Sequence, residues 1–284
     1  MPEGDAVFRF ARKIRDALQD QVVRAAHAQG PGAVPRAERL IGATCTAVTT
    51  HGKNLVITFD NGLALRGHLR MYGTWELYKP GEPWRRHPNQ ARLVLHTDET
   101  VLVNFSAPVI ELHESRALDT YRPLTYLGPD LLDDAFDPGE SLRRFRDPLR
   151  AGATIGDAIM DQEIMAGVGN IWKHETLFHA RVNPWLRVRE LPDDELGAII
   201  AKARELLRGA AGLAHDAHGR PSMYVYARAG QPCRRCYSRI RSDVQGRDIR
   251  RTAWCPSCQP VREAQELVPR SHARSGGRPR RGAS

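Results

Sequence analysis

Four cysteines near the C-terminal end constrain this chain more tightly than any other feature of its 284 residues. Cys233 and Cys236 form one Cys-x-x-Cys pair, Cys255 and Cys258 form a second, and 18 residues separate the two pairs. This spacing is typical of two knuckles that fold around one tetrahedral Zn²⁺ ion, and four protein ligands leave that ion no open position for catalysis. We therefore expect one structural zinc; the alternative is two disulfides, which need an oxidising compartment. Cys45 is expected to be a buried apolar residue.

The distribution of charge indicates a polyanionic partner. Residues 222–284 hold 14 Lys and Arg against four Asp and Glu, whereas residues 1–221 hold 28 basic and 29 acidic residues. A basic region of this kind, in a chain of sequence pI ≈ 9.7, is typical of nucleic-acid binding, although an acidic membrane surface attracts it as well. Composition alone does not separate the two partners.

Length and hydropathy bound the class of protein. The chain has no apolar run of about 18 residues, and its first residues mix acidic, basic and apolar side chains where a signal peptide has an apolar block. We expect a soluble, cytoplasmic, nucleoid-associated protein without a membrane partner. A chain of 284 residues exceeds the usual size of one domain, which favours two domains plus a small module.

Hydrophobic periodicity predicts an α+β multidomain chain whose first domain covers residues 2–118. From about residue 42 to residue 113, short β-rich runs alternate with turn signals such as DNG, which predicts an antiparallel β-sandwich. An amphipathic helix is predicted ahead of it over residues 5–18, because apolar residues recur there at helical spacing: Val7, Phe8, Ala11, Ile14 and Leu18.

The second half is predicted to be helical and to end in the zinc module. Residues 119–140 are rich in Pro, Gly and Asp, which indicates an interdomain linker. Residues 141–221 form a helical domain, in which two helices flank the turn AGVGN and Asn170 caps the second. Residues 222–262 make the zinc module, and residues 263–284 have too few apolar side chains to pack, so we expect a disordered basic tail.

Several segments resemble the formamidopyrimidine-DNA glycosylase and endonuclease VIII family. They are MPEGD at the start, GKNL around Lys53, DQ followed by AGVGNI, VYARAGQPC before the first knuckle, and RRTAWCPSCQ around the second. None is distinctive alone, but their order and spacing over residues 2–259, together with the cysteine pattern, identify the family. The resemblance implies catalysis in the first domain, a helix-two-turn-helix element in the second, and a C-terminal zinc finger.

The resemblance implies that Pro2 is the catalytic nucleophile. Once Met1 is removed, its secondary amine would attack C1′ of the damaged nucleotide and form a Schiff base. An α-amino group has a reference pKa of about 8 against about 10.4 for Lys, so more of it is neutral at physiological pH. The dipole of the following helix disfavours protonation further. A Met-Pro start taken alone is more often a terminus without function.

Glu3 and Lys53 match two further catalytic positions of the family. Glu3 matches the general acid/base beside the nucleophile; the alternative is an acidic residue that the helix dipole stabilises in a first turn. Lys53, expected in a strand, matches the lysine that contacts the phosphate near the lesion; the alternative is a solvated surface lysine. Many family members carry Glu where this chain has Ala6, and whether Asp5 replaces that carboxylate stays open.

The resemblance also implies the DNA-binding residues. Asn170 matches the asparagine of the helix-two-turn-helix, where backbone amides and the helix dipole hold a phosphate; the alternative is an ordinary helix cap. Arg250 matches the zinc-finger arginine that grips phosphates beside the lesion, and is otherwise a solubilising residue. Arg70, Met71 and Tyr72 occupy the loop that enters the duplex and fills the gap left by a flipped base, unless they are core residues at a strand end.

The segment 103–114, VNFSAPVIELHE, indicates the endonuclease VIII branch. The branch that favours oxidised purines carries a DPRRFG-like stretch at this place, and this chain does not. The segment before VYARAGQPC is also short, which leaves little room for the loop that covers 8-oxoguanine in the purine branch. Oxidised pyrimidines are therefore the expected substrates.

These observations predict a bifunctional DNA glycosylase and AP lyase of base excision repair, which cleaves the abasic strand by β,δ-elimination. We expect damaged DNA as the partner, a monomer, one structural zinc and no small-molecule cofactor. Two alternatives stay open. One is an AP lyase with weak glycosylase activity, which the missing carboxylate at Ala6 leaves open; the other is a non-catalytic zinc-finger DNA-binding protein, against which Pro2, Glu3 and Lys53 argue.

Overall fold

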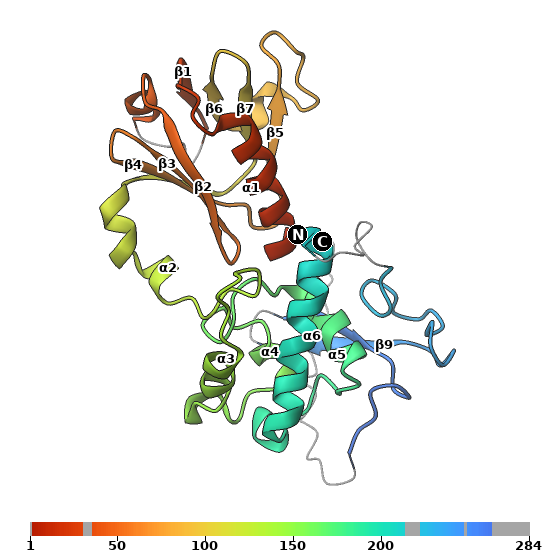
Figure 1. Ribbon diagram of the computed structural model, residues 1–284. Coiled ribbons are helices and arrows are strands. Elements are labelled where there is room, and N and C mark those ends of the chain that lie inside the picture. The colour runs from red at the N-terminus through yellow and green to blue at the C-terminus, as the bar shows by residue number, and fades with distance from the viewer. Residues whose placement is uncertain (1, 31–35, 214–221, 247–248, 263–284) are drawn as a thin grey trace, which may run out of the picture.

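The chain folds into a β-rich lobe and a helical lobe, joined by a segment that contains the short helix α2 (Arg122–Thr125) (Figure 1). Helix α1 (Gly4–Leu18) lies where the lobes meet and contacts α6 (Asp193–Ala211) of the helical lobe. The start of the chain is therefore at the junction of the two lobes. The computed structural model describes residues 2–30, 36–213, 222–246 and 249–262.

The N-terminal lobe holds two four-stranded antiparallel sheets, as predicted. The first has the strand order β1-β6-β7-β5 and the second the order β2-β3-β4-β8. The strands of the first sheet are β1 (Ala25–Ala28), β6 (Ala91–His96), β7 (Val101–Phe105) and β5 (Thr74–Tyr78). Those of the second are β2 (Cys45–His51), β3 (Asn54–Phe59), β4 (Leu63–His68) and β8 (Val109–Glu114). Strand β1 was not predicted, because its sequence AAHA carries no alternation of apolar and polar residues.

Helix α1 begins one residue before the predicted start and serves both lobes. Its apolar stripe is buried in the core of the N-terminal lobe, whereas Phe8, on another side of the helix, packs against the core of the helical lobe. The helix therefore fixes the chain start relative to both lobes. The buried stripe consists of Val7, Ala11, Ile14 and Leu18.

Helix α5 (Asn170–His179) is the centre of the helical lobe. Residues Ile171 to Phe178 are all buried, and Trp172 is fully enclosed by the core. The other helices of the lobe are α3 (Pro138–Phe145), α4 (Ile155–Ala158) and α6. Short 3-10 helices complete the described chain: η1 (Ala37–Leu40), η2 (Pro88–Gln90), η3 (Ser115–Thr120), η4 (Pro148–Arg150) and η5 (Val188–Glu190).

The first of the two helices predicted around the turn AGVGN is only the four-residue helix α4. The chain after it forms an irregular loop that the side chain of Gln162 holds in place. Its amide nitrogen donates to the carbonyls of Met160 (2.7 Å) and Val168 (2.9 Å), and its amide oxygen accepts from the backbone N–H of Gly167 (3.1 Å). A side chain that satisfies the backbone in this way competes with helix formation, and the apolar periodicity does not reveal it.

The C-terminal module is built on the antiparallel hairpin of β9 (Arg241–Gln245) and β10 (Arg250–Trp254). Three consecutive residues of α5 attach this module to the helical lobe. Lys173 Nζ donates to Thr252 Oγ1 (2.7 Å), His174 Nε2 accepts from the backbone N–H of Ala253 (2.8 Å), and Glu175 accepts from the backbone N–H groups of residues 224–226. The module is thus fixed to the same helix that forms the centre of the lobe.

Among the described residues no helix is long and apolar enough to cross a lipid bilayer. The predicted disordered tail, residues 263–284, lies outside the described residues.

Candidate active site

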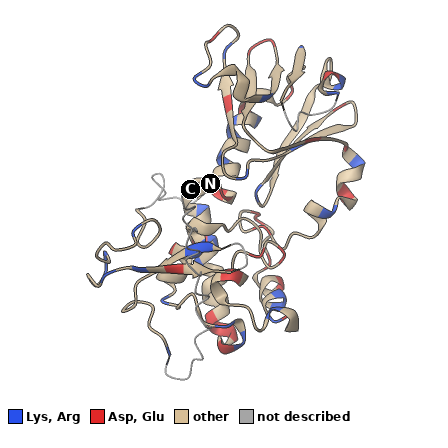
Figure 2. Cartoon of the chain, turned by 180° about the vertical axis from the view of Figure 1, so that it is seen from behind, with Lys and Arg blue, Asp and Glu red and all other residues tan. Residues whose placement is uncertain are grey.

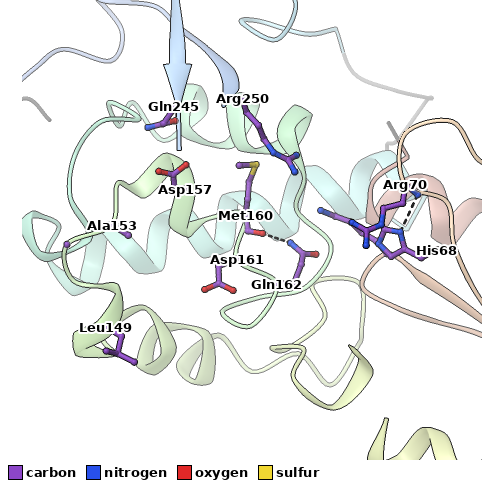
Figure 3. Close-up of a pocket in the computed structure, with 12 residues that line it drawn as sticks. His68, Arg70, Leu149, Ala153, Asp157, Met160, Asp161, Gln162, Gln245 and Arg250 are labelled. Atoms are coloured by element: carbon purple, nitrogen blue, oxygen red, sulfur yellow. Dashed lines mark hydrogen bonds between the residues drawn. The ribbon is translucent and has the colours of Figure 1, made fainter. Parts of the chain in front are cut away.

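A cavity of about 650 Å³ at the junction of the lobes is lined by six of the eight predicted catalytic and DNA-binding residues. A second cavity, of about 730 Å³, shares Arg70 and Arg250 with the first and adds Lys53 and His68. Figure 3 shows Arg70 and His68 on the N-terminal lobe, with Arg250 and Met160 across the space from them. The first cavity is lined by Glu3, Arg70, Met71, Tyr72, Ser106, Pro108, Asn170, Tyr226, Arg250 and Arg251.

Glu3 joins the start of the chain to the first turn of α5. Its carboxylate accepts hydrogen bonds from the backbone N–H groups of Gly169 (3.0 Å), Ile171 (2.7 Å) and Trp172 (3.1 Å). Burial raises the pKa of the Glu3 carboxyl, although Lys53 and the N–H groups of Ile171 and Trp172 act in the opposite direction. The residue is therefore a buried carboxyl in the cavity wall, with a pKa moved toward that of a general acid/base.

Gly4 at the chain start and Gly169 of the turn AGVGN leave no room for a side chain where these two segments pack together. The backbone N–H of Gly4 donates to the carbonyl of Gly167 (3.0 Å), and a Cβ on Gly4 would lie 2.8 Å from the Cα of Gly167. A Cβ on Gly169 would lie 2.4 Å from Cδ of Glu3. Only glycine allows this close approach of the backbone, so the motif and the N-terminus specify each other.

Asp5 does not supply the carboxylate that is missing at Ala6. Its side chain is fully buried, where it accepts from Trp172 Nε1 (2.9 Å) and pairs with Arg9 (2.9 Å). Arg9 also donates to the carbonyl of Ala210, so that Asp5 belongs to the contact between α1 and α6. We conclude that Asp5 stabilises the junction of the lobes and does not line the cavity that Glu3 lines.

Lys53 lies in a two-residue turn between β2 and β3 and not in a strand, contrary to the prediction. The preceding Gly52 has a φ of +59°, which favours glycine, and its N–H donates to Asp130 Oδ2 (2.7 Å) in the segment between the lobes. Burial lowers the pKa of Lys53 to about 8; Arg250 acts in the same direction and Glu3 in the opposite one. The turn thus places Lys53 where the charges of both Glu3 and Arg250 act on it.

The predicted wedge loop projects from the end of β4. Met71 and Tyr72 are 61% and 77% exposed, which excludes the alternative that they are core residues. The loop begins with Arg70 at a φ of +50°, and the backbone N–H of Arg70 donates to Nδ1 of His68 (3.2 Å). Burial and the nearby arginines lower the pKa of His68 to about 4, so the ring is neutral and can accept this bond. An exposed apolar tip beside a cavity fits a residue that inserts between bases.

Asn170 is the first residue of α5 and does not cap it, contrary to the prediction. The capping residue is Gly169, and Glu3 satisfies the amides of residues 169, 171 and 172. The family resemblance had implied that backbone amides of this turn hold a phosphate. These three N–H groups are not free to do so, because they donate to Glu3. The side chain of Asn170 lines the cavity, and its buried Oδ1 has no hydrogen-bond partner among the described residues.

Arg250 begins β10 and lines both cavities. Its cross-strand partner is Gln245, whose amide donates to Thr154 Oγ1 (3.1 Å) and to the carbonyl of Pro184 (2.8 Å). Thr252 in turn donates to Gln245 Oε1 (2.9 Å). This buried polar network connects the hairpin to the helical lobe beside Arg250. In Figure 2, the positions of Lys and Arg are coloured blue along the ribbon, on both lobes near their junction and in the C-terminal module.

The four cysteines of the two Cys-x-x-Cys pairs lie together, with ligand atoms within 4.8 Å of one another. The sulfurs of Cys233 and Cys258 are 4.0 Å apart and those of Cys236 and Cys255 are 3.4 Å apart, and all four thiols are free. Neighbouring sulfurs in a tetrahedral ZnS₄ centre are about 3.8 Å apart, given a Zn–S bond of about 2.3 Å. The cluster therefore fits a metal ion, and the disulfide alternative does not hold in this structure.

Several site residues were not singled out from the sequence. Tyr226 lines the cavity; its ring packs edge-on against His174 and its backbone N–H donates to Glu175. His68 and Asp130 support the wedge loop and the Lys53 turn, respectively. Tyr226 and His68 stand in or beside motifs that were recognised, but no spacing rule marks a residue whose role depends on a partner far along the chain.

Two models of known domains match the chain. The formamidopyrimidine-DNA glycosylase N-terminal domain matches residues 1–108, and the formamidopyrimidine-DNA glycosylase H2TH domain matches residues 127–219. The first contains Glu3, Lys53 and the wedge loop, and the second contains Asn170.

Whole-length relatives agree with these matches. The probable endonuclease 8 2 of Streptomyces coelicolor is 37% identical, over 99% of this chain and 100% of the relative. The DNA-(apurinic or apyrimidinic site) lyase Nei2 of Mycolicibacterium smegmatis is 32% identical, over 91% and 99%. The fold matches the complex between the Lactococcus lactis Fpg and an abasic site containing DNA, with a TM-score of 0.80 and 22% identity over 92% of this chain and 100% of that one. The chain belongs to the formamidopyrimidine-DNA glycosylase and endonuclease VIII family.

Proposed function

We propose that this chain, a bifunctional DNA glycosylase and AP lyase of base excision repair, removes oxidised pyrimidines and uses the amine of Pro2 as its nucleophile. The observation that carries the proposal is the composition of the junction cavity. It places Glu3, Asn170, Arg250 and the exposed wedge loop around one space, directly at the start of α1. A flipped nucleotide in this space would meet a carboxyl, a cation and the chain start together.

The proposed chemistry begins with attack of the Pro2 amine on C1′ and departure of the damaged base. The sugar ring then opens: the C1′–O4′ bond breaks, O4′ takes a proton, and the C1′=N bond of a Schiff base forms. This Schiff base acidifies the C2′ proton, so that loss of the proton breaks the C3′–O bond by β-elimination, and δ-elimination then releases the sugar fragment. Glu3 is the group proposed to give and take protons, because it adjoins Pro2 in the chain and burial raises its carboxyl pKa.

The proposed DNA contacts come from both lobes. Lys53 and Arg250 supply positive charge for the phosphates beside the lesion, and Asn170 supplies a side-chain amide in the cavity wall. Met71 and Tyr72 are exposed at the tip of the wedge loop and would replace the stacking contacts of the extruded base. Damaged DNA is thus the proposed partner, bound by a monomer.

We propose Zn²⁺ as the ion of the four-cysteine cluster. When bound, it would fix the two knuckles that flank the β9–β10 hairpin and so keep Arg250 at the cavity. No step of the chemistry involves it, because the four thiolates fill a tetrahedral coordination sphere. The division into domains at residues 2–118, 119–140, 141–221 and 222–262 is part of the same proposal.

The turn between β7 and β8 supports the pyrimidine preference. Ser106, at a φ of +56°, and Pro108 form this turn and line the cavity. The purine branch carries its DPRRFG-like stretch at this position in the sequence, so the short turn gives the proposed base pocket a different wall. The other sequence argument, the short segment before VYARAGQPC, falls largely on residues 214–221, outside the described part of the chain.

Single-turnover excision from matched duplexes tests this proposal. We expect 5-hydroxyuracil to be removed at least about 10-fold faster than 8-oxoguanine, a difference of about 1.4 kcal/mol in the activation free energy. Hot alkali reveals bases that were removed without strand cleavage, which separates the glycosylase step from the lyase step. Equal rates, or faster removal of 8-oxoguanine, would contradict the pyrimidine assignment.

The environment of Asp5 favours a second candidate function, an AP lyase with weak glycosylase activity. The chain has Ala6 at the family's auxiliary carboxylate, and Asp5 is engaged with Trp172 and Arg9, so no neighbouring acid replaces it. This candidate predicts rapid cleavage of a preformed abasic site and slow release of both damaged bases in the same assay.

A further inference from the structure

The side chain of Arg66 on β4 lies within the N-terminal lobe, 6% exposed. Its Nε and Nη2 both donate to Oδ1 of Asn54, at 3.1 and 2.7 Å, and its Nη1 donates to Oε2 of Glu111 at 2.8 Å. A guanidinium can hold two partners in fixed directions because its donors are coplanar. Arg66 therefore forms a rigid link between strands β3 and β8.

On one side, this link ends at the turn that carries Lys53. Asn54 follows Lys53 directly, and its Nδ2 donates to the carbonyl of His51 (2.9 Å) on the other side of the turn. His51 and Asn54 are also cross-strand partners in the hairpin. The Asn54 side chain thus closes the turn, and Arg66 holds the other end of the same amide.

On the other side, the link ends at the segment that joins the lobes. Oε2 of Glu111 also accepts from the hydroxyl of Tyr121 (2.9 Å) and contacts Nε2 of His113 (3.1 Å). The centroid of the Tyr121 ring lies 5.3 Å from Cζ of the Arg66 guanidinium. Tyr121 is the residue immediately before α2 in the sequence. Further along the same segment, Asp130 reaches the turn directly, because it accepts from the backbone N–H of Gly52. The joining segment is therefore connected to the Lys53 turn at two places, through Tyr121 and through Asp130.

We propose that Arg66 is a positioning residue for Lys53: through Asn54 it holds the Lys53 turn, and through Glu111 and Tyr121 it connects that turn to the segment between the lobes. The inference rests on the proposed role of Lys53 in the chemistry. Lys53 occupies a two-residue turn in which Glu3 attracts its ammonium and Arg250 repels it, and the Asn54 side chain closes that turn by its bond to the carbonyl of His51. Loss of Arg66 leaves the amide oxygen of Asn54 and the Glu111 carboxylate without their charged partner, which frees the turn.

Arg66→Met is the principal test, with the full-length protein and a duplex that carries 5-hydroxyuracil. We expect its single-turnover rate to fall by about 10-fold, the loss that follows when a catalytic group shifts by a fraction of an ångström. Tyr121→Phe removes a single hydroxyl from the network and should lower the rate by about threefold, since one hydrogen bond to a charged partner is lost. Arg39→Met is the matched control, because Arg39 pairs with Glu114 of the same strand β8 on the surface.

A double-mutant cycle with Lys53→Ala separates positioning from general stabilisation. If Arg66 acts through Lys53, Arg66→Met lowers the rate of the Lys53→Ala variant by less than about twofold. An equal loss in both backgrounds, or a rate for Arg66→Met that matches Arg39→Met, overturns the proposal. Should Arg66→Met fail to fold, Tyr121→Phe enters the same cycle with the same criterion. A Lys53→Ala rate equal to wild type would instead refute the proposed role of Lys53 itself.

Discussion

At the scale of single residues, Glu3 combines two roles that are usually separate. Its carboxylate accepts hydrogen bonds from the first backbone N–H groups of α5, and it also lines the cavity where the chemistry is proposed. A helix N-terminus stabilises a carboxylate, whereas burial destabilises it, and here burial dominates so that the pKa rises. The same three hydrogen bonds fix the direction of the side chain. The proposed general acid/base is therefore preorganised by the N–H groups at the start of α5.

The lowered pKa of Lys53 predicts that the rate of the enzyme falls at alkaline pH. Burial lowers its pKa to about 8, so the ammonium is charged below that pH and neutral above it. Because the proposed role needs the positive charge, we expect the single-turnover rate on damaged duplex to fall as pH rises through about 8. Lys53→Arg, whose guanidinium stays protonated, should have a lower rate that no longer declines up to about pH 9.5.

A pH series of single-turnover rates for both proteins checks this expectation. The amine of Pro2, as the proposed nucleophile, should produce a rise of the rate with pH in wild type and variant alike, so only the decline distinguishes the two proteins. If the rate of Lys53→Arg declines with pH in the same way, the decline belongs to another group and Lys53 has no electrostatic role in the reaction.

At the scale of elements, α5 connects the parts of the site. Its first turn binds Glu3 from the chain start, and its residues Lys173, His174 and Glu175 bind the C-terminal module that presents Arg250. Burial lowers the pKa of His174 to about 4, so the ring is neutral and accepts from Ala253 through Nε2. The C-terminal module is thus coupled to Glu3 through one buried helix.

Gly169→Ala tests the contact between α5 and the chain start. The new Cβ would lie 2.4 Å from Cδ of Glu3, so the carboxyl must move. We expect the free energy of unfolding to fall by about 1–3 kcal/mol and the single-turnover rate by a factor on the order of 10².

Gly197→Ala is the matched control within a helix. Its Cβ would meet no described atom within 4 Å, so this variant should gain about 0.5–1 kcal/mol of stability from helix propensity and keep its rate. Urea unfolding and excision assays on both variants give the comparison; a wild-type rate for Gly169→Ala would show that the position of Glu3 does not matter.

Local sequence signals predicted the elements that depend on local physics. The stripe of Val7, Ala11, Ile14 and Leu18 gave α1 to within one residue, and the cysteine spacing gave the cluster. The placement of Lys53 in a strand was wrong although Gly52 marks a turn, and the capping role of Asn170 was wrong because its competitor, Glu3, is 166 residues from Gly169 in sequence. The Arg66 link joins four distant segments, which no window along the chain contains.

At the scale of the whole molecule, the site exists only where the two lobes meet. The N-terminal lobe contributes Glu3, Lys53 and the wedge loop, and the helical lobe and its C-terminal module contribute Asn170 and Arg250. The bonds from Gly4 to Gly167 and from Gly52 to Asp130 cross the junction beside the site. The geometry of the candidate site therefore depends on how the two lobes are arranged. This explains why most of the predicted site residues lie close together although they are scattered through the sequence.

Borohydride trapping tests the central claim most directly. Borohydride reduces a Schiff base to a stable amine, so wild-type protein mixed with a strand that carries an abasic site should become covalently attached, with the linkage at Pro2 by peptide mapping. Pro2→Ala is less decisive, because its primary amine can also form an imine, so the mapped site is the criterion. Attachment at Pro2 is the predicted result; a linkage at Lys53 or another lysine, or no covalent complex with active protein, would contradict the account.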